Sequence, residues 1–186
     1  MNENCCKGAT FVSNLVYLKR IVGETGPKKV QAAMDKAGVK LDLGKISEKD
    51  WLPIETRLAF LEAVKKGLKW DDKRIFSMGT DAVNHSAVIK LLLGYFLSVN
   101  TAIKFSPEIW VRNYTCGEMV IVTNEMGFGR IALNNFKGTP IMCVYLRGFF
   151  HGVGASLAKA KNVQVREDKC QHRGDPRCEY TFTWVD

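Results

Sequence analysis

The sequence predicts an α+β fold in which N-terminal helices precede a mostly antiparallel sheet, with a long glycine-rich helix packed on that sheet. Apolar residues recur at helical spacing through the first half of the chain. After Thr115 the pattern changes to short apolar or alternating runs, which are typical of strands. An apolar stretch with spaced glycines separates those runs. Helices and strands that are segregated along the chain in this way indicate an α+β domain.

The first two helices have recognisable ends. Apolar residues recur at helical spacing from Phe11 onward, and Gly23 ends this helix. A second helix is expected over residues 27–37, because Pro27 suits a first helical turn and a glycine follows the last residue. Residues 42–50 are polar and are expected to form a loop.

Longer helices complete the first half. Pro53 begins a helix that is expected over residues 54–68 and carries an apolar stripe. After a short polar linker, another long helix is expected over residues 80–102. Pro107 is expected to break the helical pattern before a last segment at residues 108–113, because proline removes a helical hydrogen bond.

The second half predicts a sheet and one helix. Residues 119–122 and 130–133 form a predicted hairpin around a glycine-containing turn. A helix is expected over residues 140–160, and strands are expected at 163–165 and 180–184, where residues alternate as in a half-buried strand. The small residues along one side of the helix, which allow close packing, are Gly148, Gly152 and Ala155.

The bulk composition fits one domain. The chain has 186 residues, of which 46% are hydrophobic and 25% charged, which suffices for a core. We expect a single ligand-binding domain over residues 1–186, with a helical part at 8–114 and an α/β part with a metal site at 115–186. No apolar run approaches the roughly 20 residues of a membrane span. The N-terminus lacks the pattern of a signal peptide, so we expect a cytoplasmic protein.

The net charge of +8 is spread along the chain. Positions 1–80 hold 15 basic and 10 acidic residues, and positions 81–186 hold 12 and 9, with no block of like charges. Dedicated nucleic-acid binding requires a basic patch or stripe, which this distribution does not provide. The charge therefore favours general solubility over nucleic-acid recognition.

The cysteines suggest a metal site. In a cytoplasmic protein, cysteines are more often metal ligands or free thiols than disulfides. Cys170 and Cys178 flank a predicted turn, so their sulfurs can share an ion, and Glu167 precedes Cys170 by three residues. Cys143, near the start of the glycine-rich helix, can supply the fourth ligand of a tetrahedral zinc ion. The remaining cysteines are Cys116 and the pair Cys5 and Cys6, which is expected to be mobile and exposed.

Spacing alone leaves alternatives open. Cys143 lies in an apolar run and can be a packed core thiol, while Cys170 and Cys178 can be free or can pair on oxidation. His172 competes with Glu167 for the fourth ligand position. Three thiolates and a carboxylate leave a net charge of about minus two around Zn²⁺. The basic residues that can offset this charge are Arg166, Lys169, His172, Arg173 and Arg177.

Three segments carry a resemblance to a known family. They are CVYLRGFFHG at 143–152, VREDKC at 165–170 and GDPRCEYTF at 174–182. Together they resemble the 4-vinyl reductase domain family, which includes hydrocarbon-binding proteins and the sensor domains of aromatic-responsive transcription activators. The resemblance is strong over positions 140–186 and loose over 108–139, and before that only the order of helices is similar.

The resemblance implies a ligand set and a fold. In zinc-containing sensor members, a cysteine before the glycine-rich helix, a glutamate and two later cysteines bind the metal. The matching positions are Cys143, Glu167, Cys170 and Cys178, which favours Glu167 over His172. The resemblance also implies a fold shared with haem nitric-oxide sensor domains and Golgi transport subunits, and frequent dimerisation. The chain lacks the Tyr-x-Ser-x-Arg motif of the haem sensors.

Aromatic residues near the predicted helix–sheet junction can line an apolar cavity of the kind that binds small molecules. Ordinary core packing is the alternative for each of them. His151 lies on the glycine-rich helix and can be a haem ligand or a polar anchor for a bound molecule. The candidate ligand contacts are Phe96, Trp110, Tyr114, Phe128, Phe149 and His151.

The leading hypothesis is a small-molecule-binding or sensor domain, in which a structural zinc ion fixes the wall of a pocket for an apolar or aromatic ligand. The alternatives are a tetrapyrrole vinyl reductase or its accessory subunit, a haem-based gas sensor that uses His151 or His85, and a pure interaction protein. The chain shows no nucleotide fingerprint and no hydrolase triad, which argues against an enzyme. We also expect a homodimer and a signalling protein partner.

Overall fold

The computed structural model describes residues 4–85, 98–157 and 160–185. It confirms the α+β class that the sequence predicts. The helices are α1 (Ala9–Val22), α2 (Thr25–Lys36), α3 (Ile54–Gly67), α4 (Asp72–Ala82), α6 (Val99–Asn113) and α7 (Pro140–Ala155), with short 3₁₀ turns η1 (Leu43–Lys45) and η2 (Gln171–Arg173). The strands are β1 (Cys5–Lys7), β2 (Trp51–Pro53), β3 (Glu118–Glu125), β4 (Phe128–Asn134), β5 (Lys161–Lys169) and β6 (Cys178–Val185).

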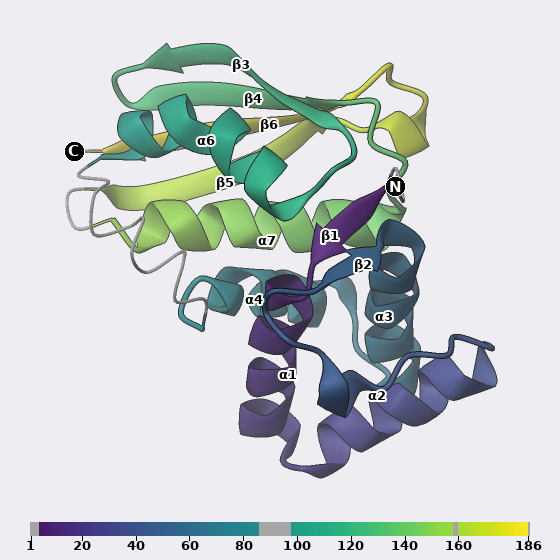
Figure 1. Cartoon of the computed structure of the whole chain (residues 1–186). Helices are drawn as coiled ribbons and strands as arrows, with labels where there is room; N and C mark the ends of the chain where they lie inside the picture. The colour runs from purple at the N-terminus through teal and green to yellow at the C-terminus, as the bar shows by residue number, and fades with distance from the viewer. Residues whose placement is uncertain (1–3, 86–97, 158–159, 186) are drawn as a thin grey trace.

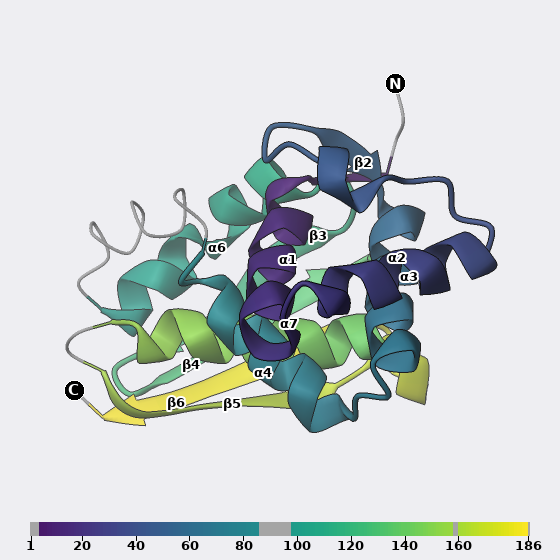
Figure 2. The ribbon, with the colours of Figure 1, turned by 90° about the horizontal axis from the view of Figure 1, so that it is seen from below.

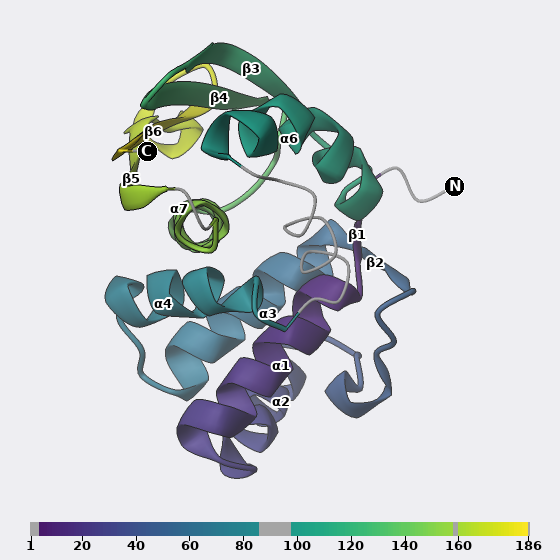
Figure 3. The same ribbon diagram turned by 90° about the vertical axis from the view of Figure 1, so that its left-hand side faces the viewer.

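The elements are stacked in layers (Figure 1). The sheet of β3 to β6 forms one side of the molecule, and helices α1 to α4 form the other. Figure 3 shows α7 end-on between these two parts, with α6 beside it on the same face of the sheet. Seen from below, α1 and α4 cross over α7 (Figure 2). Helix α7 is therefore buried on several sides, which explains why its sequence is apolar nearly all round.

The main sheet is antiparallel, with strand order β3-β4-β6-β5. Ile131 of β4 lies opposite Tyr180 of β6, and Val165 of β5 lies opposite Phe182. Tyr180 and Phe182 share one face of β6 because side chains alternate along a strand. Both rings contact the ring of Phe150 in α7. The Phe150 centroid lies 5.0 Å from that of Tyr180 and 6.0 Å from that of Phe182. This register fixes how β6 meets α7.

The N-terminal segment differs from the prediction. Cys5 and Cys6 are buried, with exposed fractions of 6% and 0%. Strand β1 pairs with β2, and Cys6 is bridged to Tyr114 at the end of α6. The Thr115 amide donates to the Cys5 carbonyl at 2.9 Å, and the Cys5 amide donates to Thr115 Oγ1 at 2.7 Å. Because these partners are distant in sequence, the local pattern gave no sign of them.

Helix α6 continues through Pro107, so the predicted break there is wrong. A proline nitrogen cannot donate to the carbonyl four residues earlier, which here belongs to Ile103. The Ser106 hydroxyl donates to that carbonyl at 2.8 Å and satisfies it. Ile103 and Trp110, on either side of the proline, are 3% and 4% exposed, so core packing holds both halves of the helix.

The single helix predicted over residues 80–102 is also wrong. Helix α4 begins at Asp72, inside the predicted linker, because the Asp71 carboxylate accepts from the Arg74 amide at 2.9 Å and caps it. It ends at Ala82 and is followed by a turn. Helix α6 begins at Val99. Residues 86–97 of the predicted helix lie outside the described residues.

Helix α7 ends at Ala155, five residues before the predicted end. The chain turns there so that β5 can return along the helix. Val163 of β5 packs so closely on Gly154 that a Cβ on this glycine would lie 2.6 Å from Val163 Cγ1. In the described part of the chain, no helix is both long and apolar enough to cross a membrane.

Glycines allow α7 and α4 to cross at close range. A Cβ on Gly148 would lie 2.1 Å from the Phe76 carbonyl oxygen, and one on Gly152 would lie 2.3 Å from that of Thr80. The Thr80 hydroxyl also donates to the Gly148 carbonyl at 3.1 Å. Ala155, predicted to share this stripe, is exposed. The close packing of the α7 backbone on the α4 backbone therefore requires glycine at positions 148 and 152.

Replacing Gly148 with alanine is expected to lower the free energy of unfolding by about 1–3 kcal/mol, the usual cost of overpacking a tight core. The new methyl group would meet the backbone of Phe76 in α4, which cannot rotate away as a side chain can. Urea denaturation measures the change. Gly44→Ala is the control, because its new Cβ meets only the Asp42 carboxylate at 3.3 Å. Equal stability of the two variants would contradict the close crossing.

Candidate functional site

The four predicted metal ligands come together in space. Their ligand atoms all lie within 4.8 Å of one another. Cys143 comes from the first turn of α7, Glu167 from β5, and Cys178 from the first position of β6. Cys170 follows β5 directly. His172, the alternative fourth ligand, is not part of this group.

The turn between β5 and β6 brings the two later cysteines together. The Asp175 carboxylate accepts from the Cys170 amide at 2.8 Å, and the Arg173 amide donates to the Cys170 carbonyl at 2.8 Å. Gly174 has a φ of 94°, a conformation that glycine adopts without strain. These bonds fold the chain back on itself, so Cys178 begins its strand beside Cys170.

The cluster is compact and buried. The Cys143 sulfur lies 3.8 Å from the Cys178 sulfur and 3.9 Å from that of Cys170. All three cysteines are buried. Glu167 Oε2 accepts from Arg173 at 3.3 Å, but Oε1 is buried and has no partner among the described residues. A buried carboxylate oxygen without a partner is costly, so Oε1 is free to bind a metal ion.

The hydrogen bond between Cys143 and Cys178 separates their acidities. Either sulfur can be the donor in this bond. With Cys143 donating, the bond lowers the pKa of the Cys178 thiol to about 7. The same bond, together with burial, raises the pKa of the Cys143 thiol. Burial also raises the pKa of Cys170. One thiolate therefore forms near neutral pH, whereas a metal ion has to displace protons from the other two cysteines.

The neighbouring basic residues are mostly paired with other acids. Lys169 and Arg177 bind the buried Glu179, at 3.1 and 2.7 Å. Arg166 binds Asp168. Of the basic residues expected to offset the charge of the site, Arg173 is the one that forms an ion pair with a residue of the cluster, Glu167, at 3.3 Å. The other three lysine and arginine side chains therefore neutralise Asp168 and Glu179 and not the four residues of the cluster.

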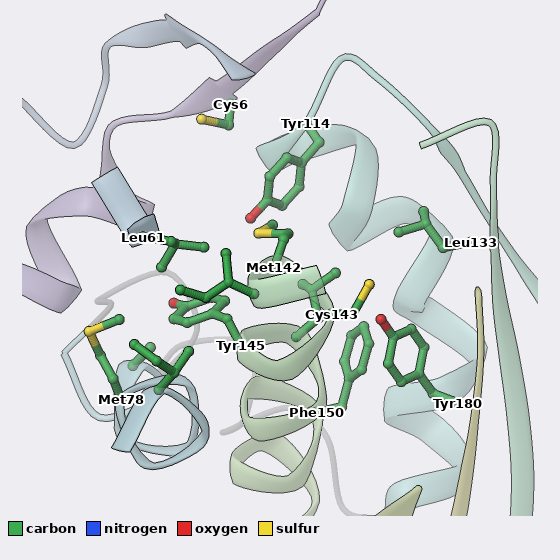
Figure 4. Close-up of a cluster of buried hydrophobic side chains, with 14 of the residues drawn as sticks. Cys6, Leu61, Met78, Tyr114, Leu133, Met142, Cys143, Tyr145, Phe150 and Tyr180 are labelled. Carbon is green, nitrogen blue, oxygen red and sulfur yellow. The ribbon is translucent and has the colours of Figure 1, made fainter. Parts of the chain in front are cut away.

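Tyr180 lies just outside the ligand cluster. Its side chain is fully buried, and its hydroxyl has no hydrogen-bond partner among the described residues. Figure 4 shows this hydroxyl directed toward the Cys143 sulfur, with Phe150 beside the ring. Burial raises the pKa of Tyr180, and the neighbouring Cys143 adds to the rise. The hydroxyl is thus a neutral donor next to the Cys143 sulfur.

An apolar cavity of about 110 Å³ lies between α1, α6, α7 and the sheet. An engineered cavity of about 150 Å³ lined by apolar side chains binds benzene, so this one is of the right order for a single ring. The aromatic residues of its wall are Trp110 and Tyr114 at the end of α6, Tyr145, Phe149 and Phe150 of α7, and Phe182 of β6.

The structure separates the candidate ligand contacts. Trp110, Tyr114 and Phe149 line the cavity, whereas Phe128 and His151 are not among its lining residues. Phe96 lies outside the described residues. Sequence reasoning missed Tyr145 as a lining residue. Its spacing of four from Phe149 was the available signal, since residues at i and i+4 share a helix face.

A haem group requires an axial ligand, which is often histidine. The three histidines lie elsewhere: His85 beside Asp81 at 2.8 Å, His151 against the Phe76 ring, and His172 in η2. None of them is among the cavity's lining residues. Tyr114, Tyr145 and Met119 are the lining side chains of a type that can bind haem iron. The described residues therefore do not fit a histidine-ligated haem.

No family model matches the chain, and no curated protein matches it in sequence. The resemblance to the 4-vinyl reductase domain family therefore stays a prediction. Solved structures do match, and they extend over nearly the whole chain.

An H-NOX protein from S. oneidensis, a mutant in the Fe(II) ligation state, matches with a TM-score of 0.71 and 14% identity, over 97% of this chain and 96% of its own. The Fe(II) unliganded H-NOX protein from K. algicida matches with a TM-score of 0.68 and 10% identity, over 97% of each chain. A structure concerned with heme redox potential and porphyrin distortion matches with a TM-score of 0.67 and 9% identity, over 95% of this chain and 99% of its own. At these identities the likeness establishes the fold: the chain has the fold of H-NOX domains.

Proposed function

We propose that this protein is a small-molecule sensor domain that binds an apolar or aromatic ligand in its cavity and a structural zinc ion at Cys143, Glu167, Cys170 and Cys178. The observation that carries the proposal is that the same two elements build both sites. Helix α7 carries Cys143 and six described lining residues of the cavity, and β6 carries Cys178 and the lining residue Phe182. Fixing the ends of these elements also fixes the cavity wall.

The donor set supports zinc. Three thiolates and a carboxylate match the sulfur and oxygen ligands that zinc accepts in a tetrahedral site. All four positions come from the protein, which is typical of a structural rather than a catalytic site. When bound, zinc would supply cross-linking energy rather than a reactive centre. It would join the β5–β6 turn to the start of α7.

The chemistry of the cavity supports an apolar ligand. Most of its wall is aliphatic or aromatic, and within residues 4–85, 98–157 and 160–185 no carboxylate, lysine or arginine lines it. Apolar pockets with few polar groups are typical of small-molecule sites. Because the volume is close to that of a one-ring ligand, a monocyclic aromatic molecule such as toluene is the natural probe.

Native mass spectrometry of the purified full chain tests both parts together. We expect one zinc ion per chain and an additional mass shift when toluene is added. A spectrum with zinc but without bound toluene would support only the metal site. A spectrum with neither zinc nor toluene would overturn the proposal. The same spectrum reports the number of subunits, so it also tests the predicted homodimer.

Tyr180→Phe is expected to weaken zinc binding about 10-fold, the lower end of the usual effect of outer-shell partners. A thiolate at Cys143 would accept a hydrogen bond from the Tyr180 hydroxyl, and phenylalanine removes only that hydroxyl. Competition with a chromogenic chelator measures the affinity. Tyr17→Phe is the matched control, because Tyr17 is buried against Trp70 away from the cluster. Equal affinity of the two variants would argue against this role.

Haem-based gas sensing is the second candidate, because the solved structures that share the fold include Fe(II) H-NOX proteins and a study of heme distortion. Among the described lining residues, the side chains that could serve as the axial ligand are Tyr114, Tyr145 and Met119. A Soret band after reconstitution with haemin, lost on substitution of one of these three residues, would favour this candidate. Absence of the band would leave the apolar-ligand sensor.

The vinyl reductase activity, a signalling partner and a cytoplasmic location remain predictions from the sequence. In the part of the chain that the structure describes, hydroxyl groups are the evident proton donors of the cavity lining. We therefore give the enzymatic alternative no residue assignments.

A further inference from the structure

A buried cation lies behind the cavity wall. Arg57 of α3 has an exposed fraction of 0%. Its guanidinium carbon lies 5.4 Å from the ring centroids of both Phe11 and Phe60, and 4.6 Å from that of Tyr145. Arginine stays protonated in proteins, and a buried charge is normally paired with an acid. Among the described residues, however, none of the ion pairs includes Arg57, and its Nε and Nη1 groups have no hydrogen-bond partner.

Arg57 makes one hydrogen bond with the described residues, and this bond begins a series of hydrogen bonds that leads to Tyr145. Its Nη2 donates to Asn14 Oδ1 at 2.7 Å. Arginine has no acceptor, so the Asn14 atom that faces it must be the oxygen, and this fixes the orientation of the amide. Asn14 Nδ2 then donates to the Tyr145 hydroxyl oxygen at 3.2 Å. Because that oxygen accepts, the Tyr145 O–H remains available to donate onward.

Tyr145 brings this donor to the cavity. It is a lining residue, and α7 holds it between Arg57 and the cavity. In this series of hydrogen bonds, each donor group points from Arg57 toward the cavity. Hydrogen bonds aligned in this manner strengthen one another. Trp110 Nε1, another donor of the lining, is used by the Cys116 carbonyl at 3.0 Å, and Tyr114 is the second lining residue among those described that carries a phenol hydroxyl. The serine, threonine and asparagine side chains of the lining donate to backbone carbonyls of their own segments instead. These are Thr10 to Lys7, Ser13 to Thr10, Ser106 to Ile103 and Asn113 to Ile109.

We propose that Arg57, Asn14 and Tyr145 select a ligand with one aromatic ring and an anionic oxygen, in practice an aromatic carboxylate. The ring occupies the apolar part of the cavity, and a carboxylate oxygen accepts from the Tyr145 hydroxyl. The negative charge of the ligand then serves as the missing counter-ion of Arg57 in an interior of low dielectric constant. This inference rests on the proposed binding of a small aromatic ligand and names its chemical class.

Three probes of similar size test the selection: benzoate, benzyl alcohol and toluene. Isothermal titration gives the affinities, and quenching of Trp110, a lining residue, offers an independent signal. We expect benzoate to bind about 10- to 100-fold more tightly than toluene, as a hydrogen bond to a charged group implies. Benzyl alcohol, which accepts a hydrogen bond but carries no charge, should lie between them. This comparison needs only the unmodified protein.

Tyr145→Phe removes the donor and keeps the ring. We expect it to lower the ratio of benzoate to toluene affinity about 10-fold, since it removes one charge-assisted hydrogen bond. Tyr17→Phe, a buried tyrosine that does not line the cavity, should keep the ratio of the unmodified protein.

The outcomes separate this inference from the proposed function. Equal binding of benzoate and toluene would overturn the selection of an anion and leave the apolar-ligand sensor intact. Binding of none of the three probes would overturn both. A preference for benzoate that persists in Tyr145→Phe would overturn the role of the Arg57–Asn14–Tyr145 chain.

Discussion

Replacing Cys178 with serine is expected to remove zinc and to lower the free energy of unfolding by at least about 4 kcal/mol, an effect of the size that marks loss of a metal site. The Cys178 thiol is the one whose pKa is lowered to about 7, so it supplies the most readily formed thiolate. It also begins β6, the strand that lies between β4 and β5. Losing the metal would release this strand from α7 and from the β5–β6 turn.

The measurement is guanidinium denaturation together with the zinc content of the same sample. Cys116→Ser is the matched control, because Cys116 is a buried cysteine outside the ligand cluster. It should keep its zinc and show only the smaller cost of burying a hydroxyl. A Cys178→Ser protein that binds no zinc but unfolds at the same denaturant concentration as the unmodified chain would falsify the structural role. Hydrogen exchange in the chelator-treated protein should rise mainly in β5, β6 and the start of α7.

Filling the cavity is expected to abolish ligand binding without unfolding the protein. Ala102 of α6 lines the cavity and is 7% exposed. A phenylalanine at this position would place its ring where we expect the ring of the ligand. We expect toluene affinity to fall more than about 100-fold, because a ring-sized site cannot hold two rings. Stability should change by no more than about 2 kcal/mol, since filling a cavity often offsets the strain that it introduces.

Ala155→Phe provides the control for this experiment, because it makes the same chemical change at an exposed position at the end of α7. It should bind toluene as the unmodified protein does. Toluene affinity that survives Ala102→Phe would place the binding site elsewhere and would remove the cavity from the proposed function. Titration calorimetry and thermal unfolding of both variants decide between these results.

Much of the fold followed from local signals. Three helix ends in the structure lie within a few residues of the positions predicted from Gly23, Gly38 and Pro53. The hairpin around Gly127 forms as expected, with a φ of 72° at that glycine. These features depend on the backbone preferences of a few neighbouring residues, which the sequence contains directly.

The predictions of local structure were wrong where contacts between segments distant in the sequence overrode those backbone preferences. Pro107 stays within a helix because Ser106 satisfies the freed carbonyl and the core holds both sides. Cys5 and Cys6 are buried because β2 and the end of α6 cover them. Neither outcome can be derived from local propensity, since tertiary packing decides it.

The sequence by itself determined the chemistry of the candidate metal site: three cysteines and a glutamate of the types that bind zinc, at positions that flank one turn and open one helix. Only the tertiary structure brought these four ligand atoms within 4.8 Å and left Glu167 Oε1 without another partner. It alone placed Arg57 in the core, although arginine in a helical pattern is normally exposed. The physical reason is that residue type fixes which interactions a side chain can make, whereas the packing of distant segments decides which of them it does make.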